Sequence, residues 1–409
     1  MTHPSSKSQF EFIALMASLM SVVALAIDAI LPALDVIGLQ IGTQLAVDNQ
    51  LLVTMIFLGL GIGPLLFGPL SDSKGRKPIV YIGFALFLFA SLICVFADSL
   101  EVMVMGRILQ GIGLSAPRTM AIAIIRDKYS GDYMARIMSF VTVVFLLIPI
   151  IAPALGKFIL DFYDWQGIFY VQMGISGLVA LWFWRRQEES LAPENKKALK
   201  RVLFINGLKE IFKHKTTVGY TIISGFITGS FMVYLSSSQQ IFENQYGLEK
   251  EFPFIFAGLA IAIGSAIFLN ANLVMRFGMK NIITASLIAY FLISITYVVI
   301  FNNQSNPDIA VLLAFFAIQF FAIGFMFGNL RAMAMEAVGH IAGMAAAITG
   351  FISTLMAVAI STFIGRFIDQ TVMPLFLGFS ISALCSIAIL LYLQKSTPRV
   401  KRNLAATNS

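Results

Sequence analysis

The chain has 409 residues, of which 58% are hydrophobic and only 12% are charged, and its formal net charge is +7. Soluble domains carry about 25% charged residues, and a globular core could not hide this much apolar side chain from water. The composition therefore excludes an ordinary soluble protein and favours a chain that lies in a lipid bilayer.

Long apolar runs divide the chain into spanning segments. A helix needs roughly 20 apolar residues to cross a bilayer, whereas the strands of a membrane β-barrel would alternate with period two. The runs predict twelve helices, at 11–34, 49–71, 78–97, 101–125, 135–160 and 166–185, and then at 217–238, 253–275, 281–301, 308–334, 342–366 and 373–393. The expected fold is an all-α membrane protein made of two pseudo-symmetric six-helix bundles.

A polar stretch separates the two sets of six helices. We expect an N-terminal bundle at 1–185, a basic linker at 186–216, a C-terminal bundle at 217–394 and a tail at 395–409. Most of the 28 Lys and Arg residues fall in alternate loops, in the linker and at the two ends, and loops rich in these residues face the cytoplasm. Both termini and the linker are therefore predicted to be cytoplasmic. The linker suits either a surface helix on the inner leaflet or a solvated tether.

Ionisable residues are rare in the predicted spans, where they are costly and mark function. Asp28 lies in the first span, four residues before Pro32. Because burial disfavours the charged form of a carboxylate, Asp28 could take up and release a proton; the alternative is an acid held ionised by an Arg partner. Arg107, in the fourth span, could tune such a carboxylate or orient it through paired hydrogen bonds.

Arg118 follows Arg107 by eleven residues, which places it on the same helix face, ~16 Å further along the axis. It could hold an anionic or strongly polar substrate group, or it could reach the cytoplasmic interface. Uncharged polar and aromatic residues of the second half could line a greasy pocket. The candidates for this pocket are Phe231, Tyr234, Gln239, Asn270, Gln319 and Asn329.

Four short motifs accompany these charges. They are Asp28-Ala-Ile-Leu31-Pro32, Gly68-Pro-Leu-Ser-Asp72-Ser-Lys-Gly75-Arg76-Lys77, Arg107-Ile-Leu-Gln110-Gly111-Ile-Gly113, and Pro149-Ile-Ile-Ala152-Pro153-Ala-Leu-Gly156. Together they resemble the signatures of the major facilitator superfamily, over the whole chain. Within that superfamily the first and last motifs are similar to those of the twelve-helix drug:proton antiporters, of the bicyclomycin and chloramphenicol resistance (Bcr/CflA) type.

The resemblance implies roles at the matched positions. Asp28 would be the protonation site, and Arg107 would assist proton coupling. The cytoplasmic gate motif would comprise Gly68, Asp72, Gly75, Arg76 and Lys77, with Asp72 and Arg76 in a charge-relay latch. The antiporter motif would comprise Pro149, Ala152, Pro153 and Gly156, and it would shape the outer gate; Ala152 and Lys157 stand where the family has Gly.

The chain is therefore expected to be a multidrug efflux protein, a proton antiporter that exports small amphiphilic compounds such as antibiotics across the inner (cytoplasmic) membrane. We expect it to act as a monomer driven by the proton gradient, with no cofactor, metal or nucleic acid. No G-x-x-x-x-G-K-[ST] loop for ATP is readable, and His3, His214 and His340 are isolated in the sequence.

Two other classes compete with an exporter. A proton symporter that imports a small metabolite would share the loop motif and is the main alternative. An enzyme should show clustered acids or histidines at one membrane interface, which the sequence lacks, and a channel would not need the six-plus-six repeat with a latch motif.

Overall fold

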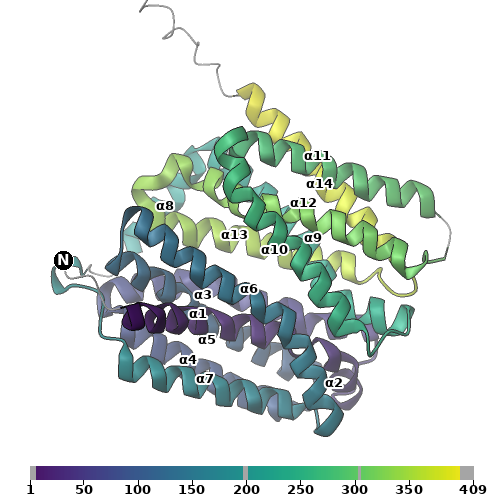
Figure 1. Ribbon diagram of the computed structural model, residues 1–409, viewed down its shortest axis with the longest axis horizontal. Helices are drawn as coiled ribbons and strands as arrows, with labels where there is room; N and C mark the ends of the chain where they lie inside the picture. Colours follow the sequence, from purple (N-terminus) through teal and green to yellow (C-terminus); the bar gives the residue numbers. More distant parts are fainter. Residues whose placement is uncertain (1–5, 197–200, 303–304, 397–409) are drawn as a thin grey trace, which may run out of the picture.

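A computed structural model describes residues 6–196, 201–302 and 305–396 (Figure 1). The helices of the first half are α1 (Ser6–Asp28), α2 (Leu34–Gln40), α3 (Leu51–Lys74), α4 (Arg76–Val95), α5 (Leu100–Lys128), α6 (Gly131–Phe162) and α7 (Gln166–Arg186). The later helices are α8 (Arg201–Lys213), α9 (Lys215–Gln239), α10 (Phe252–Phe277), α11 (Met279–Phe301), α12 (Ile309–Met335), α13 (Ala342–Gly365) and α14 (Met373–Ser396). Short helical turns join some of them: η1 (Leu31–Ala33), η2 (Ala46–Gln50), η3 (Pro193–Asn195), the π-helix η4 (Gln240–Gln245) and η5 (Glu336–Ile341).

The described chain holds eleven stretches that are long and apolar enough to cross a membrane. One of them, Ile309–Gly365, has 57 residues. A continuous helix of that length would measure ~85 Å against a hydrocarbon core of ~30 Å. Because η5 divides this stretch into α12 and α13, the twelve predicted spans each correspond to a helix, and the predicted fold class is confirmed.

The helices form two groups that lie side by side (Figure 1). The purple and teal helices α1 to α7 gather below, and the green and yellow helices α9 to α14 gather above. Contacts between the groups run mainly between α3 and α13 and between α6 and α10, and α9 also contacts α3, η1 and η2. The residue bounds of the two bundles stay a prediction.

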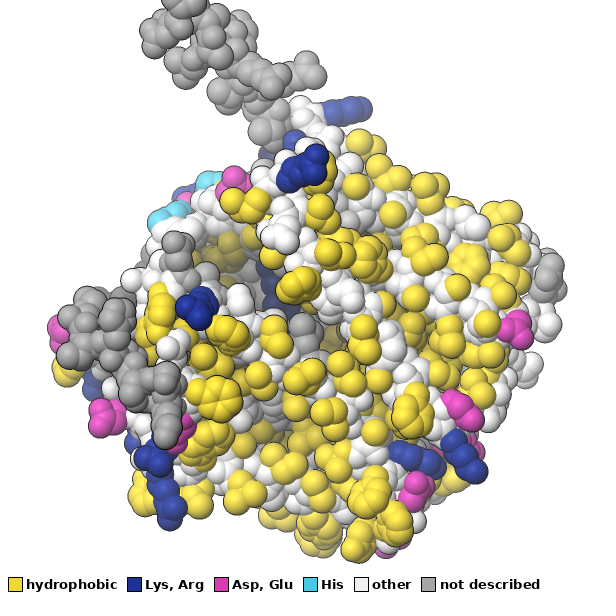
Figure 2. Space-filling model, in the orientation of Figure 1, with side chains coloured by type: hydrophobic (Ala, Val, Ile, Leu, Met, Phe, Trp, Pro, Cys, Tyr) yellow, Lys and Arg dark blue, Asp and Glu magenta, His cyan; other side chains and the backbone are white. Residues whose placement is uncertain are grey.

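Hydrophobic side chains cover much of the outer surface (Figure 2). Phe254 is 78% exposed, Phe268 is 74% exposed and Val299 is 72% exposed. Apolar patches this wide are rare on soluble proteins. Lipid tails are the solvent that such a surface requires.

Two tight turns occupy equivalent places in the two bundles. Gly75 joins α3 to α4 with a φ of 108°, and Gly278 joins α10 to α11 with a φ of 77°. Glycine adopts such positive φ values without steric cost. In the sequence, Gly75 precedes Arg76 and Lys77, and Gly278 lies between Arg276 and Lys280, so a glycine with basic neighbours recurs at the same turn in both halves.

The first predicted span, 11–34, is not one straight helix. α1 ends at Asp28, and the chain continues through η1 into α2. Pro32 has no N–H to donate to the carbonyl of Asp28 four residues earlier. The break therefore follows from the proline, and it places Asp28 at a helix end inside the bundle.

Part of the linker is helical, but its apolar side packs on the second bundle, whereas the sequence predicted either a helix on the inner leaflet or a solvated tether. α8 buries Ile211 against Val338, Ala345 and Ile348. Its apolar side thus packs on η5 and α13, because these elements offer an apolar surface. The sequence alone did not show that this surface lies next to the linker. Residues 197–200, which include Leu199 of the same apolar pattern, lie outside the described residues.

Two of the histidines are not isolated. His214 Nε2 lies 3.3 Å from Glu210 Oε1, and His340 Nε2 lies 3.9 Å from the same oxygen. Hydrogen bonds from Lys213 and His214 hold the pKa of Glu210 below its ordinary value. Among the described residues, no three His, Cys, Asp or Glu side chains gather in a way that could hold a metal; His3 lies outside them.

Candidate functional site

Asp28 lies at the break of α1 and is only 4% exposed. Its carboxylate forms no hydrogen bond or ion pair with any residue that the structure describes. Burying an unpaired charge is costly, so the site favours a neutral carboxyl group. A carboxyl group held in this way can take up a proton and lose it when its surroundings change.

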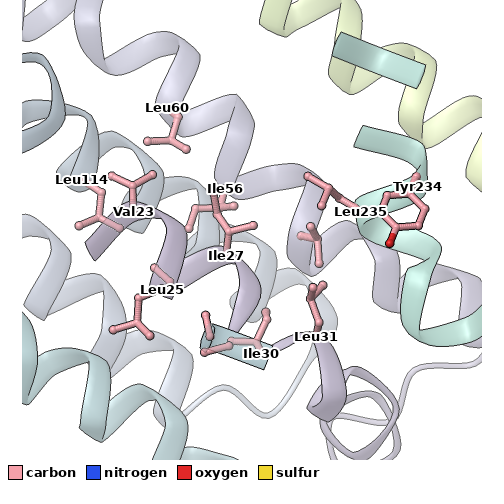
Figure 3. Close-up of a cluster of buried hydrophobic side chains, with 14 of the residues drawn as sticks. Val23, Leu25, Ile27, Ile30, Leu31, Ile56, Leu60, Leu114, Tyr234 and Leu235 are labelled. Carbon is pink, nitrogen blue, oxygen red and sulfur yellow. The ribbon is translucent and has the colours of Figure 1, made fainter. Parts of the chain in front are cut away.

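Apolar side chains from both bundles surround this break (Figure 3). The labelled side chains are Val23, Leu25, Ile27, Ile30 and Leu31 near the break, Ile56 and Leu60 of α3, Leu114 of α5, and Tyr234 and Leu235 of α9. Tyr234 is 2% exposed, and its hydroxyl has no hydrogen-bond partner among the described residues. It belongs to the same buried cluster as Ile27 and Leu31, so the second bundle contributes an unpaired hydroxyl group to the side chains around the break.

Arg107 is fully buried, and its guanidinium bonds to three groups. Nε donates to the carbonyl of Leu52 at 2.7 Å, and Nη2 donates to the carbonyl of Ala26 at 3.0 Å. Nη1 donates to Gln110 Oε1 at 2.7 Å, and Gln110 Nε2 donates to Ser91 Oγ at 2.7 Å. This network ties α5 to α1, α3 and α4.

The guanidinium of Arg107 therefore does not pair with Asp28 in this structure. It holds the carbonyl of Ala26, two residues before Asp28. Gln172 Nε2 similarly donates to the carbonyl of Leu25 at 3.4 Å. Arg107 thus fixes the backbone that carries the carboxyl group, as buried polar backbone near a helix break requires.

Helix α6 approaches the same break closely. A Cβ on Gly156 would lie 1.9 Å from the carbonyl oxygen of Ala29, so glycine allows a contact that a larger residue would prevent. Ala152, one turn earlier, is buried. Pro149 and Pro153 lie inside α6, where each removes a backbone hydrogen bond and can bend the helix. The predicted antiporter motif forms the surface against which the α1 break packs.

Replacing Gly156 with alanine is expected to push α6 away from α1. Overpacking of this kind costs about 1–3 kcal/mol, so the melting temperature of the purified protein should fall and transport should slow. Gly174→Ala is the matched control, because a Cβ on Gly174 of α7 would meet nothing within 4 Å. Equal melting temperatures for the two variants would contradict the close approach.

Hydrogen bonds join the two bundles at the end that is predicted to face outward. Gln50 Nε2 donates to Gln240 Oε1 at 2.9 Å and to the carbonyl of Gly365 at 3.4 Å. Asn244 Nδ2 donates to Asp35 Oδ2 at 2.8 Å. Gln50 and Gln240 are buried, so these contacts hold this end closed.

The gate motif lies at the opposite end. Arg76 Nη1 bonds to Asp72 Oδ1, and Arg76 Nε donates to Asp127 Oδ2 at 3.1 Å. Glu189 accepts from the backbone N–H groups of Arg76 at 2.9 Å and Lys77 at 3.0 Å. A carboxylate is favourable at this position, since it faces the N-terminus of α4. All these partners belong to the first bundle or to the residues that follow it, so the motif does not bridge the bundles in this structure.

Two glycines of the gate motif have different surroundings. Gly75, with its positive φ, faces Glu189 so closely that a Cβ would lie 2.4 Å from the carboxylate oxygen Oε2. Gly68 has open space at its Cβ position, and its carbonyl accepts a hydrogen bond from Ser71 Oγ at 2.8 Å. Sequence reasoning missed Glu189, because it lies 113 residues from Arg76.

Asp72→Asn is expected to leave substrate affinity unchanged and to slow turnover. The Asp72 side chain is 46% exposed, and an exposed ion pair contributes at most about 1 kcal/mol to stability. Asp127 and Glu189 would still hold Arg76 in place. Binding and transport rates of the purified variant, compared with wild type, check this. Weaker binding with normal turnover would contradict a gating role.

The uncharged candidates for a pocket mostly hold helices together. Gln319 is fully buried, and its Nε2 donates to the carbonyl of Tyr290 on α11 at 3.2 Å. Gln239 Nε2 donates to Glu243 Oε2 at 2.7 Å, within α9 and η4. These amides are engaged in the second bundle.

Two other candidates link α10 to α12. Asn329 Nδ2 donates to Asn270 Oδ1 at 2.8 Å, and Asn270 Nδ2 donates to Asn329 Oδ1 at 3.4 Å. The ring centroid of Phe231 lies 5.7 Å from that of Phe320 and 5.6 Å from that of Phe327. The predicted pocket residues thus come from α9, α10 and α12, and a pocket among them stays a prediction.

Arg118 is half-buried on α5, one turn beyond Leu114. It lies within electrostatic range of Arg331 on α12.

Comparison with known proteins gives a consistent result. The Major Facilitator Superfamily profile matches residues 13–362. The chain is 29% identical over 372 residues to the MFS-type transporter YdgK of Bacillus subtilis, which covers 89% of this chain and 90% of the relative. It is 26% identical over 391 residues to a bicyclomycin resistance protein homolog of Haemophilus influenzae, and the alignment covers 94% of this chain and 96% of that relative. The crystal structure of a D-xylose–proton symporter has the same fold, with a TM-score of 0.74 and 16% sequence identity. The superposition covers 96% of this chain and 98% of the symporter chain.

Proposed function

Because this chain belongs to the major facilitator superfamily and is a multi-pass membrane transporter rather than an enzyme, we propose that it exports small amphiphilic compounds in exchange for protons. Export runs across the inner (cytoplasmic) membrane, with both termini in the cytoplasm. The protein transports these compounds as a monomer, with the proton gradient as its energy source and without a cofactor. The bicyclomycin resistance relative supports placing the chain among drug:proton antiporters of the Bcr/CflA type.

The observation that carries this proposal is the unpaired carboxyl group of Asp28 at the break of α1. A buried ionisable group inside a membrane is costly, and it is retained where it serves transport. Arg107 uses its donors on Leu52, Ala26 and Gln110, so it does not neutralise Asp28. The carboxyl group is therefore available to carry a proton.

In the proposed cycle, Asp28 receives its proton from the outer side. The structure is closed at the predicted outer end by Gln50, Gln240 and Asp35, as expected of the state that faces the cytoplasm. Substrate then enters from the cytoplasm, and the proton leaves toward the same side. Rocking of the two bundles then reopens the outer end. Because Asp28 is the one acid that carries a proton in this cycle, each cycle moves one proton.

A drug-susceptibility panel tests the export. The chain is expressed in an efflux-deficient bacterium, and growth is measured with chloramphenicol, bicyclomycin and a range of other amphiphilic antibiotics. We expect tolerance to rise for a subset of these compounds with wild type and to stay at the host level with Asp28→Asn. No change for any compound, or equal protection by the variant at equal membrane expression, would contradict the proposal.

A further inference from the structure

A pocket opens between α1 and α7, which contact each other, at the end that is predicted to face the cytoplasm. Its volume is about 570 Å³, within the range of ~300–1,000 Å³ that is typical of ligand sites. The lining residues are Glu11 of α1 and Leu178, Leu181, Trp182, Arg185 and Arg186 of α7. The proposed proton and gate residues are not among them, so the pocket belongs to neither of those sites.

A hydrogen-bonded cluster forms the polar end of this pocket. Arg186 Nε pairs with Glu11 Oε1 at 3.0 Å, and Trp182 Nε1 donates to the same oxygen at 3.2 Å. Among the described residues, no side chain donates to the second oxygen of Glu11, Oε2, and no acid pairs with Arg185. One guanidinium group and one carboxylate oxygen in the same pocket are therefore available to a ligand.

The other end of the pocket is apolar and faces the lipid. Leu178 is 69% exposed and Leu181 is 44% exposed. Leu178 precedes Arg185 by two helical turns, which is ~10 Å along the axis of a helix long enough to span the membrane. The pocket thus runs from the level of the arginines toward the hydrocarbon layer. Its occupant needs a charged head and an apolar body, as a phospholipid has.

The charges at the polar end favour one kind of phospholipid headgroup. A phosphate can accept paired hydrogen bonds from the planar guanidinium group of Arg185. A primary ammonium group has three N–H donors, and one of them can bond to Glu11 Oε2. A choline headgroup has no N–H to donate, and a purely anionic headgroup would place no cation beside the Glu11 carboxylate.

We propose that this pocket binds one phosphatidylethanolamine molecule of the leaflet that faces the cytoplasm. Its phosphate bonds to Arg185, its ammonium group bonds to Glu11, and an acyl chain lies along Leu178 and Leu181. Because Glu11 belongs to α1 and Arg185 to α7, the headgroup ties these two helices together. The site does not depend on which compound the protein transports.

A lipid competition tests the headgroup. The purified full-length protein is mixed in detergent with equal amounts of dioleoyl phosphatidylethanolamine, phosphatidylglycerol and phosphatidylcholine, and the retained lipid is identified by native mass spectrometry. We expect one phosphatidylethanolamine to be retained at least about tenfold more than phosphatidylcholine, since a charge-assisted hydrogen bond is worth about that factor. Equal retention of the three lipids, or a preference for phosphatidylglycerol, would overturn the proposal.

Single variants place the lipid in the pocket. Glu11→Gln keeps an acceptor for Trp182 Nε1 and should lose most of the preference for phosphatidylethanolamine over phosphatidylcholine. Arg185→Gln should weaken the retention of both lipids at least about fivefold, because it removes the partner of the phosphate. Arg276→Gln is the matched control, an exposed arginine in the last turn of α10, and should retain lipid like wild type.

Melting temperatures near that of wild type would show that these variants are folded, since the pair of Glu11 with Arg186 is largely exposed. If Glu11→Gln keeps the full preference, or if Arg185→Gln binds as wild type does, the lipid lies elsewhere and the proposal fails.

Soluble phosphoethanolamine distinguishes a lipid site from a site for the headgroup alone. It carries both charged groups but no acyl chain, so even in large excess it should displace less than about half of the bound lipid, because it lacks the apolar contacts. Leu178→Asn should weaken retention of the lipid for the same reason. Complete displacement by phosphoethanolamine, together with unchanged lipid retention in Leu178→Asn, would overturn the assignment to a lipid.

Discussion

Asp28→Asn is expected to abolish proton-driven transport while leaving the fold intact. Asparagine has the shape of a neutral aspartic acid but cannot release a proton. Asp28 makes no hydrogen bond or ion pair with a described residue, so the substitution removes no partner. Transport driven by an imposed pH gradient in proteoliposomes should therefore fall to the level of protein-free liposomes, with an unchanged melting temperature.

Asp161→Asn provides the control for this experiment. Asp161 is half exposed at the end of α6 and pairs with Lys157 at 3.2 Å, so its side chain lies outside the proposed proton path. Its replacement should leave pH-driven transport within about twofold of wild type, because such exposed pairs contribute little. If Asp28→Asn transports as well as Asp161→Asn, Asp28 is not the proton carrier.

Arg107→Ala is expected to lower both transport and stability. The guanidinium holds the carbonyls of Leu52 and Ala26 in a buried site. Each acceptor that is left unsatisfied costs on the order of 1–3 kcal/mol, and the α1 break that carries Asp28 loses its anchor. The melting temperature should fall clearly, and the pH-driven transport rate per folded molecule should fall at least about tenfold.

The lysine variant separates charge from geometry. Arg107→Lys keeps the charge but lacks the planar fork that reaches two carbonyls and Gln110 at once, so it should recover only part of the stability and part of the transport. Arg276→Ala is the control, since Arg276 is exposed. Wild-type melting and transport in Arg107→Ala would contradict the anchoring role.

The number and order of the spanning helices could be predicted from the sequence, because continuous apolar runs leave few other structures possible in lipid. The turns at Gly75 and Gly278 were also readable, since each joins a Gly with basic residues at the equivalent place. The break of α1 is encoded in Pro32, yet the apolar run continues past it. A hydropathy pattern therefore cannot show where the helix ends.

The partners of the functional side chains could not be predicted in the same way. Arg107 bonds mainly to backbone carbonyls, and a carbonyl acceptor leaves no signal in the sequence. Glu189 and Gln240 lie far along the chain from Arg76 and Gln50, which they contact.

The direction of substrate movement relative to protons tests the central claim most directly. Wild-type protein is reconstituted into proteoliposomes with the compound whose tolerance it raises most, and a pH gradient is imposed with no other energy source. The proposed antiport predicts that the compound moves opposite to the protons and that Asp28→Asn stops this movement. Movement of the compound in the same direction as the protons would identify a symporter. A transport rate that is the same with and without the pH gradient would contradict proton coupling.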